Sequence, residues 1–387
     1  MSEEKLRIFR SDSFPAYLLM LVALSGEFPT ALTHRLPASK SYADFAVKGL
    51  KRDSLLRTYY HNGLRGLRLT SRAKKLLSAE YPDRFASLFT GDPATNTPKY
   101  TLVHRLRLHR MAEVLVTMLN AGVTVLPWEK PVVFSPTPLT DAPYIDRPTY
   151  YSSREVKNLG LMSNKIRGSR AAGVLLTDGG IFVVYNTGGS EMKWRHKAEM
   201  RLKSLLEIEL CLHRLPDQFS DAEQSAIMFG ADMSRLLPLM GVGTVNRQSC
   251  FLSGESFPCF HYLTSDHYGE VILQLICDPE KKQSLDTILT EDLSPAHPGL
   301  FMENDAMDGD DPVLFGYTCD MPRIKRFDNA LHLHDKKGTL YCFDFQEDAL
   351  RELCGPNVSI QAIDFDAYEA NVFHADTDSS CCNTQET

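Results

Sequence analysis

Proline and glycine divide the first 80 residues into short segments, and this punctuation restricts the folds open to that part of the chain. An apolar helix that starts near Ser13 stops at Gly26, and a short second segment lies between Pro29 and Pro37. Ser39 then suits the N-cap of a third helix, which extends to about residue 51 with apolar side chains at helical spacing. The predicted order is helix, turn, short helix and helix.

A β-hairpin is predicted directly after these helices. Residues 54–60 are rich in strand-forming side chains, His61-Asn62-Gly63 is a turn signal, and residues 64–69 form the second strand. Thr70 or Ser71 caps a further helix. Helices followed by a hairpin in this order predict a winged helix-turn-helix.

Charge is distributed unevenly along the chain. Residues 1–80 contain 14 Lys or Arg and 7 Asp or Glu, whereas residues 301–387 contain 6 basic and 18 acidic residues. A basic amino-terminal end favours a nucleic-acid partner, and the helix after the turn is the element that enters the major groove in such modules. We therefore predict binding of double-stranded DNA. The expected contacts are Lys40, Ser41, Tyr42, Lys48, Lys51, Arg52, Arg57, Tyr59, His61, Arg65 and Arg68.

Several other classes of protein are disfavoured. The sequence contains no run of about 18 apolar residues and no secretory cleavage pattern, so we expect a cytoplasmic protein without a membrane partner. The 9 cysteines show no C-x-x-C spacing, which predicts reduced thiols and no metal site. No cofactor is expected. The adjacent Cys381 and Cys382 lie in a polar tail, where accidental exposure is the simplest interpretation.

The middle of the chain is predicted to form an α/β layer. A long amphipathic helix spans residues 101–121, and its polar side carries Arg105, Arg107, His109 and Arg110. Two apolar strands, residues 171–177 and 181–186, flank an Asp-Gly-Gly turn, and a helix at about residues 194–212 covers them.

These features resemble the replication-relaxation family of plasmid and integrative-element proteins. The resemblance covers residues 12–210 and rests on the predicted winged helix, the Arg-rich helix leading to Trp128-Glu129, the hairpin SRAAGVLLTDGGIFVVYNTG and the basic helix after it. It implies a winged helix fused to a domain related to PD-(D/E)XK nucleases, and a mobile-element setting in replication, relaxation or transfer of DNA.

The carboxylates and lysine that such a nuclease needs for Mg²⁺ and water activation are missing from the expected places. Arg170-Ala171-Ala172 stands at the start of the first hairpin strand, and Val183-Val184-Tyr185 lies on the second. An alternative catalytic set, Asp178 with Glu191 and Lys193, has the right formal spacing, and Glu155-x-Lys157 is equally loose. Asp178 is expected in a turn, so we predict a domain without catalytic residues.

The carboxy-terminal third is predicted to form a small α/β unit. Residues 221–237 suggest a helix, and residues 257–263 and 271–277 suggest a hairpin. His332 and His334 fall on one face of an expected strand without a third metal ligand. The predicted fold class is α/β (α+β), with a winged helix-turn-helix at 10–90, a nuclease-like domain at 99–215, a carboxy-terminal domain at 220–373 and a disordered tail at 374–387.

The resulting hypothesis is a non-enzymatic, sequence-specific DNA-binding accessory protein of a mobile element, whose acidic end meets replication or transfer proteins. The alternatives are a winged-helix transcriptional regulator, a Mg²⁺-dependent DNA nuclease and a module that binds only protein. A palindromic DNA site would require a homodimer.

Overall fold

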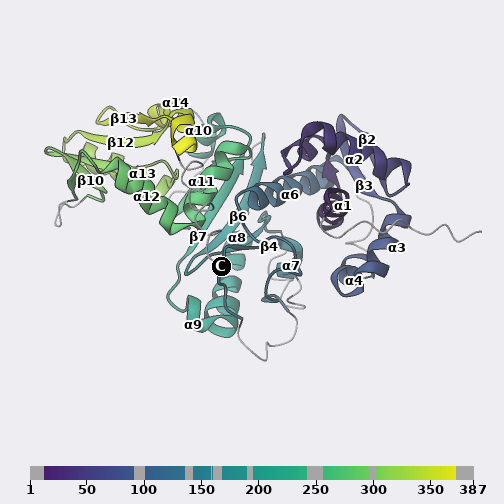
Figure 1. Ribbon diagram of the computed structural model, residues 1–387. Coiled ribbons are helices and arrows are strands. Elements are labelled where there is room, and N and C mark those ends of the chain that lie inside the picture. Colours follow the sequence, from purple (N-terminus) through teal and green to yellow (C-terminus); the bar gives the residue numbers. More distant parts are fainter. Residues whose placement is uncertain are drawn as a thin grey trace, which may run out of the picture.

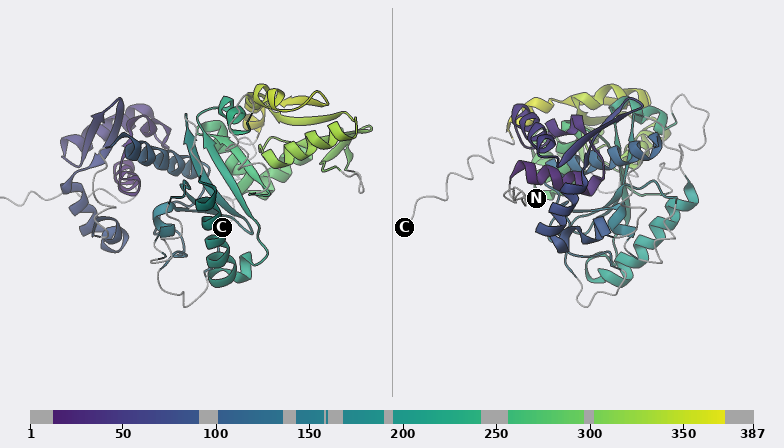
Figure 2. Two further views of the ribbon diagram at one scale, coloured as in Figure 1. Left: turned by 180° about the vertical axis from the view of Figure 1, so that it is seen from behind. Right: turned by 90° about the vertical axis from the view of Figure 1, so that its right-hand side faces the viewer.

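A computed structural model of the chain describes residues 13–90, 101–135, 143–157, 159, 168–189, 195–241, 256–296 and 302–371. Within these residues the protein is a mixed α/β structure with three sheets. The amino-terminal elements lie at one end, a central sheet in the middle and the carboxy-terminal elements at the other end (Figures 1 and 2). A sheet therefore occupies each of the three regions.

The N-terminal module (residues 13–90) has the order of elements that the sequence predicts, although its short second helix is a 3₁₀ helix. Gly26, in the left-handed region at φ +79°, ends the first helix. The strands form an antiparallel sheet in the order β1-β3-β2. Its elements are α1 (Phe14–Ser25), β1 (Phe28–Pro29), η1 (Thr30–Arg35), α2 (Lys40–Arg52), β2 (Leu56–His61), β3 (Leu64–Leu69), α3 (Ser71–Glu80) and α4 (Pro82–Thr90).

Helix α6 (Leu102–Asn120) joins this module to the rest of the chain. Ala112 and Val116 belong to the core of the N-terminal module, while Val114, Leu115 and Met118 belong to the core beside the central sheet. These positions lie on different sides of one helix, so its part from Leu108 to Met118 is largely buried, whereas residues 102–104 and 106–107 are exposed. The helix thus packs against both regions.

The central sheet has five strands in the order β4-β5-β6-β7-β8, the first three antiparallel and the last two parallel to β6. The predicted Asp-Gly-Gly hairpin is confirmed as β5 and β6. Its strands and the helices between them are β4 (Thr149–Ser152), α7 (Ser153–Val156), β5 (Gly173–Leu176), β6 (Ile181–Gly188), α8 (His196–Leu206), the π-helix η3 (Glu207–Arg214), α9 (Pro216–Phe219), β7 (Gln224–Gly230), η4 (Met233–Arg235), α10 (Leu236–Leu239) and β8 (Phe260–Thr264).

Both faces of this sheet are buried. Side chains alternate along each strand, so Val183 and Tyr185 face one core while Val184 faces the other. Helices α8 and η3 contribute to the first core, and α6 and α11 (His267–Cys277) contribute to the second. This double cover explains why the strands read as continuous apolar runs.

Two secondary-structure predictions for residues 221–277 are wrong. The central sheet continues past the expected boundary at residue 215, because β7 and β8 pair in parallel with β6. Residues 224–230 form strand β7 where a helix was expected, and residues 267–277 form helix α11 where a hairpin strand was expected. Asp266 caps α11 by accepting a hydrogen bond from the Gly269 amide.

The third sheet has the order β13-β12-β11-β10-β9, with parallel pairing among β11, β12 and β13. His332 lies in helix α13 and His334 just after it, so the predicted strand placement of both is wrong. Ile324, Phe327 and Leu331 supply the helical buried stripe there. The elements are α12 (Pro279–Leu289), β9 (Ser294–Pro295), β10 (Ala306–Asp308), β11 (Asp311–Phe315), α13 (Met321–Leu333), β12 (Gly338–Phe343), α14 (Asp344–Leu353) and β13 (Val358–Ile363).

Some sequence predictions concern residues that the structure does not describe. The tail at 374–387, including Cys381 and Cys382, lies outside the described residues, as does the expected linker at 91–100. The six cysteines that the structure describes are free thiols. No helix within the described ranges combines the length and apolar character needed to cross a bilayer.

Candidate nucleic-acid interface

Helix α2 presents one face to the core and the other to solvent. Ser39 caps its amino terminus by accepting a hydrogen bond from the Tyr42 amide at 3.3 Å. Ala43, Ala46, Val47 and Leu50 are buried at helical spacing. The opposite face therefore carries the polar predicted contacts, all of them exposed: Lys40, Ser41, Lys48, Lys51 and Arg52.

Aromatic side chains share this exposed face of α2. The exposed fraction is 68% for Phe45 and 46% for Tyr42, although the Tyr42 ring also contacts Phe14 at 5.7 Å between centroids. Asp44 is the acidic residue of this face, and His34 lies 2.9 Å from its carboxylate. The hydrogen bond from His34 lowers the pKa of Asp44. The exposed face of α2 is therefore cationic, and its one acid, Asp44, pairs with His34.

The β2–β3 hairpin exposes a second group of predicted contacts. Asn62 and Gly63 both adopt left-handed backbone angles, which is the geometry of a two-residue hairpin turn. Because β2 is the edge strand, Arg57, Tyr60 and His61 are exposed on it, and Arg65 is exposed on β3. The Arg65 guanidinium lies 5.8 Å from the centre of the Tyr60 ring.

Arg68, in contrast, is buried, so its prediction as a DNA contact is wrong. Its Nε and Nη2 donate to Glu27 Oε2 at 2.9 and 2.6 Å. Tyr59, another predicted contact, is half-buried, and its ring lies 4.0 Å from the Arg68 guanidinium and 4.6 Å from that of Arg105. The side chains of Arg68 and Tyr59 therefore pack inside the module.

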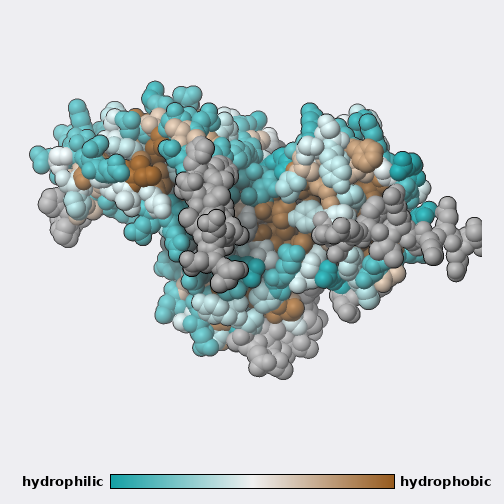
Figure 3. Space-filling view, viewed as in Figure 1, coloured by the Kyte–Doolittle hydropathy of each residue, from teal (hydrophilic) through white to brown (hydrophobic). Residues whose placement is uncertain are grey.

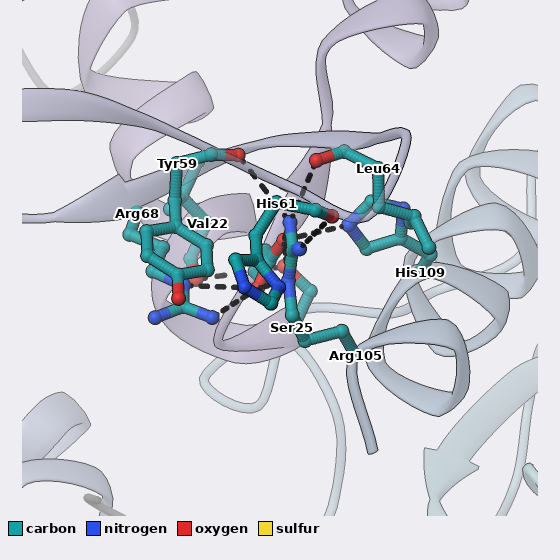
Figure 4. Close-up of polar contacts among 9 residues, drawn as sticks. Val22, Ser25, Tyr59, His61, Leu64, Arg68, Arg105 and His109 are labelled. Atoms are coloured by element: carbon teal, nitrogen blue, oxygen red, sulfur yellow. Dashed lines mark hydrogen bonds and ion pairs between the residues drawn. The ribbon is translucent and has the colours of Figure 1, made fainter. Parts of the chain in front are cut away.

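Two residues of the expected polar face of α6 are buried as well. Arg105 is fully buried and donates from Nη2 to Glu27 Oε1 at 2.6 Å, while His109 Nε2 lies 2.9 Å from the same oxygen. Figure 4 shows Arg105 and His109 reaching from α6 towards the hairpin. Glu27 therefore collects two guanidinium groups and an imidazole inside the protein.

Arg105 also holds the hairpin turn in place. Its Nη1 donates to the His61 carbonyl at 2.8 Å, and its Nη2 donates to the carbonyls of Leu64 and Tyr59 at 3.0 and 3.3 Å. The backbone at the base of the turn is thereby tied to a helix that also packs on the central sheet. The hairpin is positioned by α6 and not by its own strands alone.

Glu27 is the residue that sequence reasoning missed. Burial alone would raise the pKa of Glu27, but hydrogen bonds from His109, Arg105 and Arg68 outweigh it and lower the pKa to about 2. A Cβ at position 66 would lie 2.4 Å from Glu27 Oε1, so Gly66 makes room for the carboxylate. The available signal was a single acid between Gly26 and Phe28 in an apolar stretch, residues 13–34, that contains no other charged Asp, Glu, Lys or Arg.

Of the alternative catalytic set, Asp178 alone lies within the described residues. Asp178 is exposed in the β5–β6 turn, and Glu191 and Lys193 lie outside the described ranges. Ala171, Ala172, Val183, Val184 and Tyr185 are buried and offer no carboxylate. In the part of the chain that the structure describes, no three His, Cys, Asp or Glu side chains gather in a way that could hold a metal ion.

Comparisons with protein-family models, with curated proteins and with solved structures found no match for this chain.

Proposed function

We propose that the N-terminal module is a winged helix that binds double-stranded DNA, with α2 in the major groove and the β2–β3 hairpin against the backbone. The observation that carries the proposal is the exposed cationic face of α2. Lys40, Lys48 and Lys51 form no ion pair with any residue that the structure describes, so they remain free to neutralise phosphates.

The placement of the hairpin supports the same proposal. A major groove about 12 Å wide admits one α-helix, and a neighbouring hairpin then lies over the adjacent backbone. Arg57, His61 and Arg65 are exposed on the hairpin, and Arg105 fixes its turn. A fixed hairpin loses less conformational entropy on binding than a mobile one.

The biological setting is proposed from the family resemblance. In that setting the protein is an accessory factor of a mobile genetic element that acts in replication, relaxation or transfer of element DNA. Its acidic carboxy-terminal region would contact replication or transfer proteins. A transcriptional regulator is the nearest alternative, and mapping the bound DNA separates the two, since a regulator occupies promoters and an accessory factor an origin-like site.

Nuclease activity is the less supported alternative. The buried, uncharged side chains at Ala171, Ala172 and Val183 supply no ligand for Mg²⁺. Incubation of supercoiled plasmid with the full chain and Mg²⁺ should leave the plasmid intact. Cleavage that disappears in Asp178→Ala or Glu191→Ala would instead establish the alternative catalytic set.

A module that binds protein is a second candidate, favoured by the aromatic side chains of this region. Phe45 is 68% exposed and Tyr60 is 65% exposed, so both rings are available to an apolar partner surface. Phe45→Ser should abolish binding to such a partner, whereas Lys48→Ala should not. For DNA binding we expect the reverse order of effects.

Fluorescence anisotropy with a labelled 30-base-pair duplex of mixed sequence tests the main proposal. If Lys40, Lys48, Lys51 and Arg52 each contact a phosphate, a plot of the logarithm of the binding constant against the logarithm of salt concentration should have a slope of about −4. Binding that is absent at low salt, or that does not depend on salt, would contradict it.

A further inference from the structure

A cavity of about 210 Å³ lies between the N-terminal module and the central sheet. Its described walls come from the end of α1 and from α4 of the module, from the segment 127–134 after α6, and from β4 and α7 at the edge of the sheet. On the face drawn in Figure 3, a hollow with apolar side chains lies between the same two regions. Boundaries between domains are common places for ligand sites.

Much of the lining of this cavity is apolar, and it includes Leu24, Leu88, Val133, Phe134 and Tyr151. The Phe134 and Tyr151 rings pack edge to face at 5.2 Å between centroids, and the Tyr151 hydroxyl donates to the Pro131 carbonyl at 2.8 Å. An apolar cavity of roughly 150 Å³ holds benzene, whereas drug-sized ligands occupy roughly 300–1,000 Å³. The volume and the lining therefore suit a small molecule with one ring.

Arg154 of α7 brings a guanidinium without an acidic partner to this cavity. Its Nη1 donates to the Leu24 carbonyl at 3.1 Å, and Gly26 leaves room for it, because a Cβ there would lie 2.9 Å from Nη2. No Asp or Glu of the described ranges forms an ion pair with it. A guanidinium carries more N–H donors than this one contact uses, so Arg154 can still bind an anion.

Arg84 of α4 is a second cation of the lining. Its side chain is exposed, and its guanidinium lies 4.8 Å from the centre of the Trp128 ring and 5.0 Å from that of the Tyr81 ring. In the part of the chain that the structure describes, no carboxylate pairs with it. Arg84 therefore adds positive charge to the cavity while two aromatic rings hold its position.

Glu155, the acid among the described lining residues, is already satisfied within the protein. Its Oε1 lies 2.8 Å from Lys130 Nζ, and its Oε2 accepts from the amide and the hydroxyl of Ser152, both at 2.8 Å. The charges of Lys130 and Glu155 balance each other. Arg84 and Arg154 therefore give the described lining a net positive charge.

We propose that this cavity binds a small aromatic carboxylate, whose ring packs against the apolar lining and whose carboxylate pairs with Arg154. A guanidinium matches a carboxylate with two parallel hydrogen bonds, and Arg84 adds a second positive charge. Because Leu24 and Leu88 belong to the N-terminal module and Tyr151 to the central sheet, the ligand would contact both regions. The proposal does not depend on DNA binding by α2.

Ligand-observed NMR titration of the full chain with sodium benzoate and sodium phenylacetate tests the site. At least one of them should bind, and benzyl alcohol, which has the ring without the charge, should bind at least about tenfold more weakly. Arg154→Met should remove this preference for the carboxylate, and Arg154→Lys should restore part of it. The proposal is overturned if neither carboxylate binds wild type, or if benzyl alcohol binds as tightly as they do.

A variant that fills the cavity locates the bound molecule. Val132 lines the cavity and is 65% exposed, so Val132→Trp should abolish binding of the carboxylate without removing a charge. Val103→Trp, at a position on α6 that is 73% exposed and outside the lining, is the matched control and should leave the affinity unchanged. Unchanged affinity in Val132→Trp would place the molecule elsewhere and overturn the proposal. If Arg154→Met fails to fold, Arg84→Ala, which alters an exposed side chain, should weaken the carboxylate and not benzyl alcohol.

Discussion

Helices α2 and α6 both carry several basic residues, but the structure uses them in opposite ways. The cations of α2 lie on a solvent-facing surface, whereas Arg105 and His109 of α6 turn inward to Glu27. What separates the two helices is a single buried carboxylate at the end of α1. Basic residues on a helix therefore indicate a ligand-binding surface only where they form no ion pairs with buried carboxylates of the same chain.

The largest effect should come from Glu27→Ala. This change leaves Arg68 and Arg105 buried without their carboxylate, and removal of one partner from a buried ion pair costs about 3–5 kcal/mol. Urea unfolding followed by circular dichroism measures it. Glu80→Ala, on the exposed end of α3, is the matched control and should change stability by less than about 0.5 kcal/mol. Similar small losses in both variants would mean that Glu27 does not organise the module.

Low pH should weaken the ion pairs that Glu27 forms with its partners. The pKa of Glu27 is lowered to about 2 from its ordinary value of 4.5, so its contribution is complete above pH 4.5 and is lost as the pH falls towards 2. The full contribution of Glu27 to the free energy of unfolding is on the order of 3 kcal/mol. Unfolding free energies of wild type and Glu27→Gln should therefore converge as the pH falls through this window. A difference that stays constant would refute the ion-pair explanation.

His109→Ala should have an intermediate effect. It removes the imidazole 2.9 Å from Glu27 while both guanidinium groups remain, and a hydrogen bond to a charged group contributes about 2 kcal/mol. His104→Ala, on the exposed side of the same helix, serves as the control in thermal unfolding. A loss as large as that of Glu27→Ala would show that packing of the ring, and not the hydrogen bond, dominates.

The smallest effect on stability is expected on α2. Lys48→Ala and Lys51→Ala remove exposed charges that no described carboxylate pairs with, so the free energy of unfolding should change by no more than about 0.5 kcal/mol. Chemical denaturation checks this. A destabilisation of several kcal/mol would place these lysines with the structural cations of α6, and the contrast between the two helices would fail.

The element order of the N-terminal module was predictable because local signals agree with the fold. Proline, glycine and N-cap residues fix the helix ends, and Asn62-Gly63 fixes the hairpin. Strand β7 was not predictable in this way, because a strand buried on both faces shows an unbroken apolar run that a buried helix also shows. The prediction for helix α11 was wrong for a related reason. Val271, Ile272 and Leu273 favour a strand by local propensity, but they form a helix where they pack against the sheet.

The candidate site was predictable in part. The exposed α2 cations follow from helical periodicity, because the buried stripe places the lysines opposite it. The burial of Arg68 did not follow, because its partner Glu27 is 41 residues away in the sequence and the pairing of β1 with β3 brings them together.

Charge reversal on α2 tests the central claim most directly. Lys48→Glu/Arg52→Glu and Lys336→Glu/Lys337→Glu change the net charge equally, so titration of both variants with the same labelled duplex isolates the position of the charge. The account predicts that the α2 variant loses binding by at least about a hundredfold while the control stays within about twofold of wild type. Equal loss in both variants, or none in the α2 variant, would contradict it.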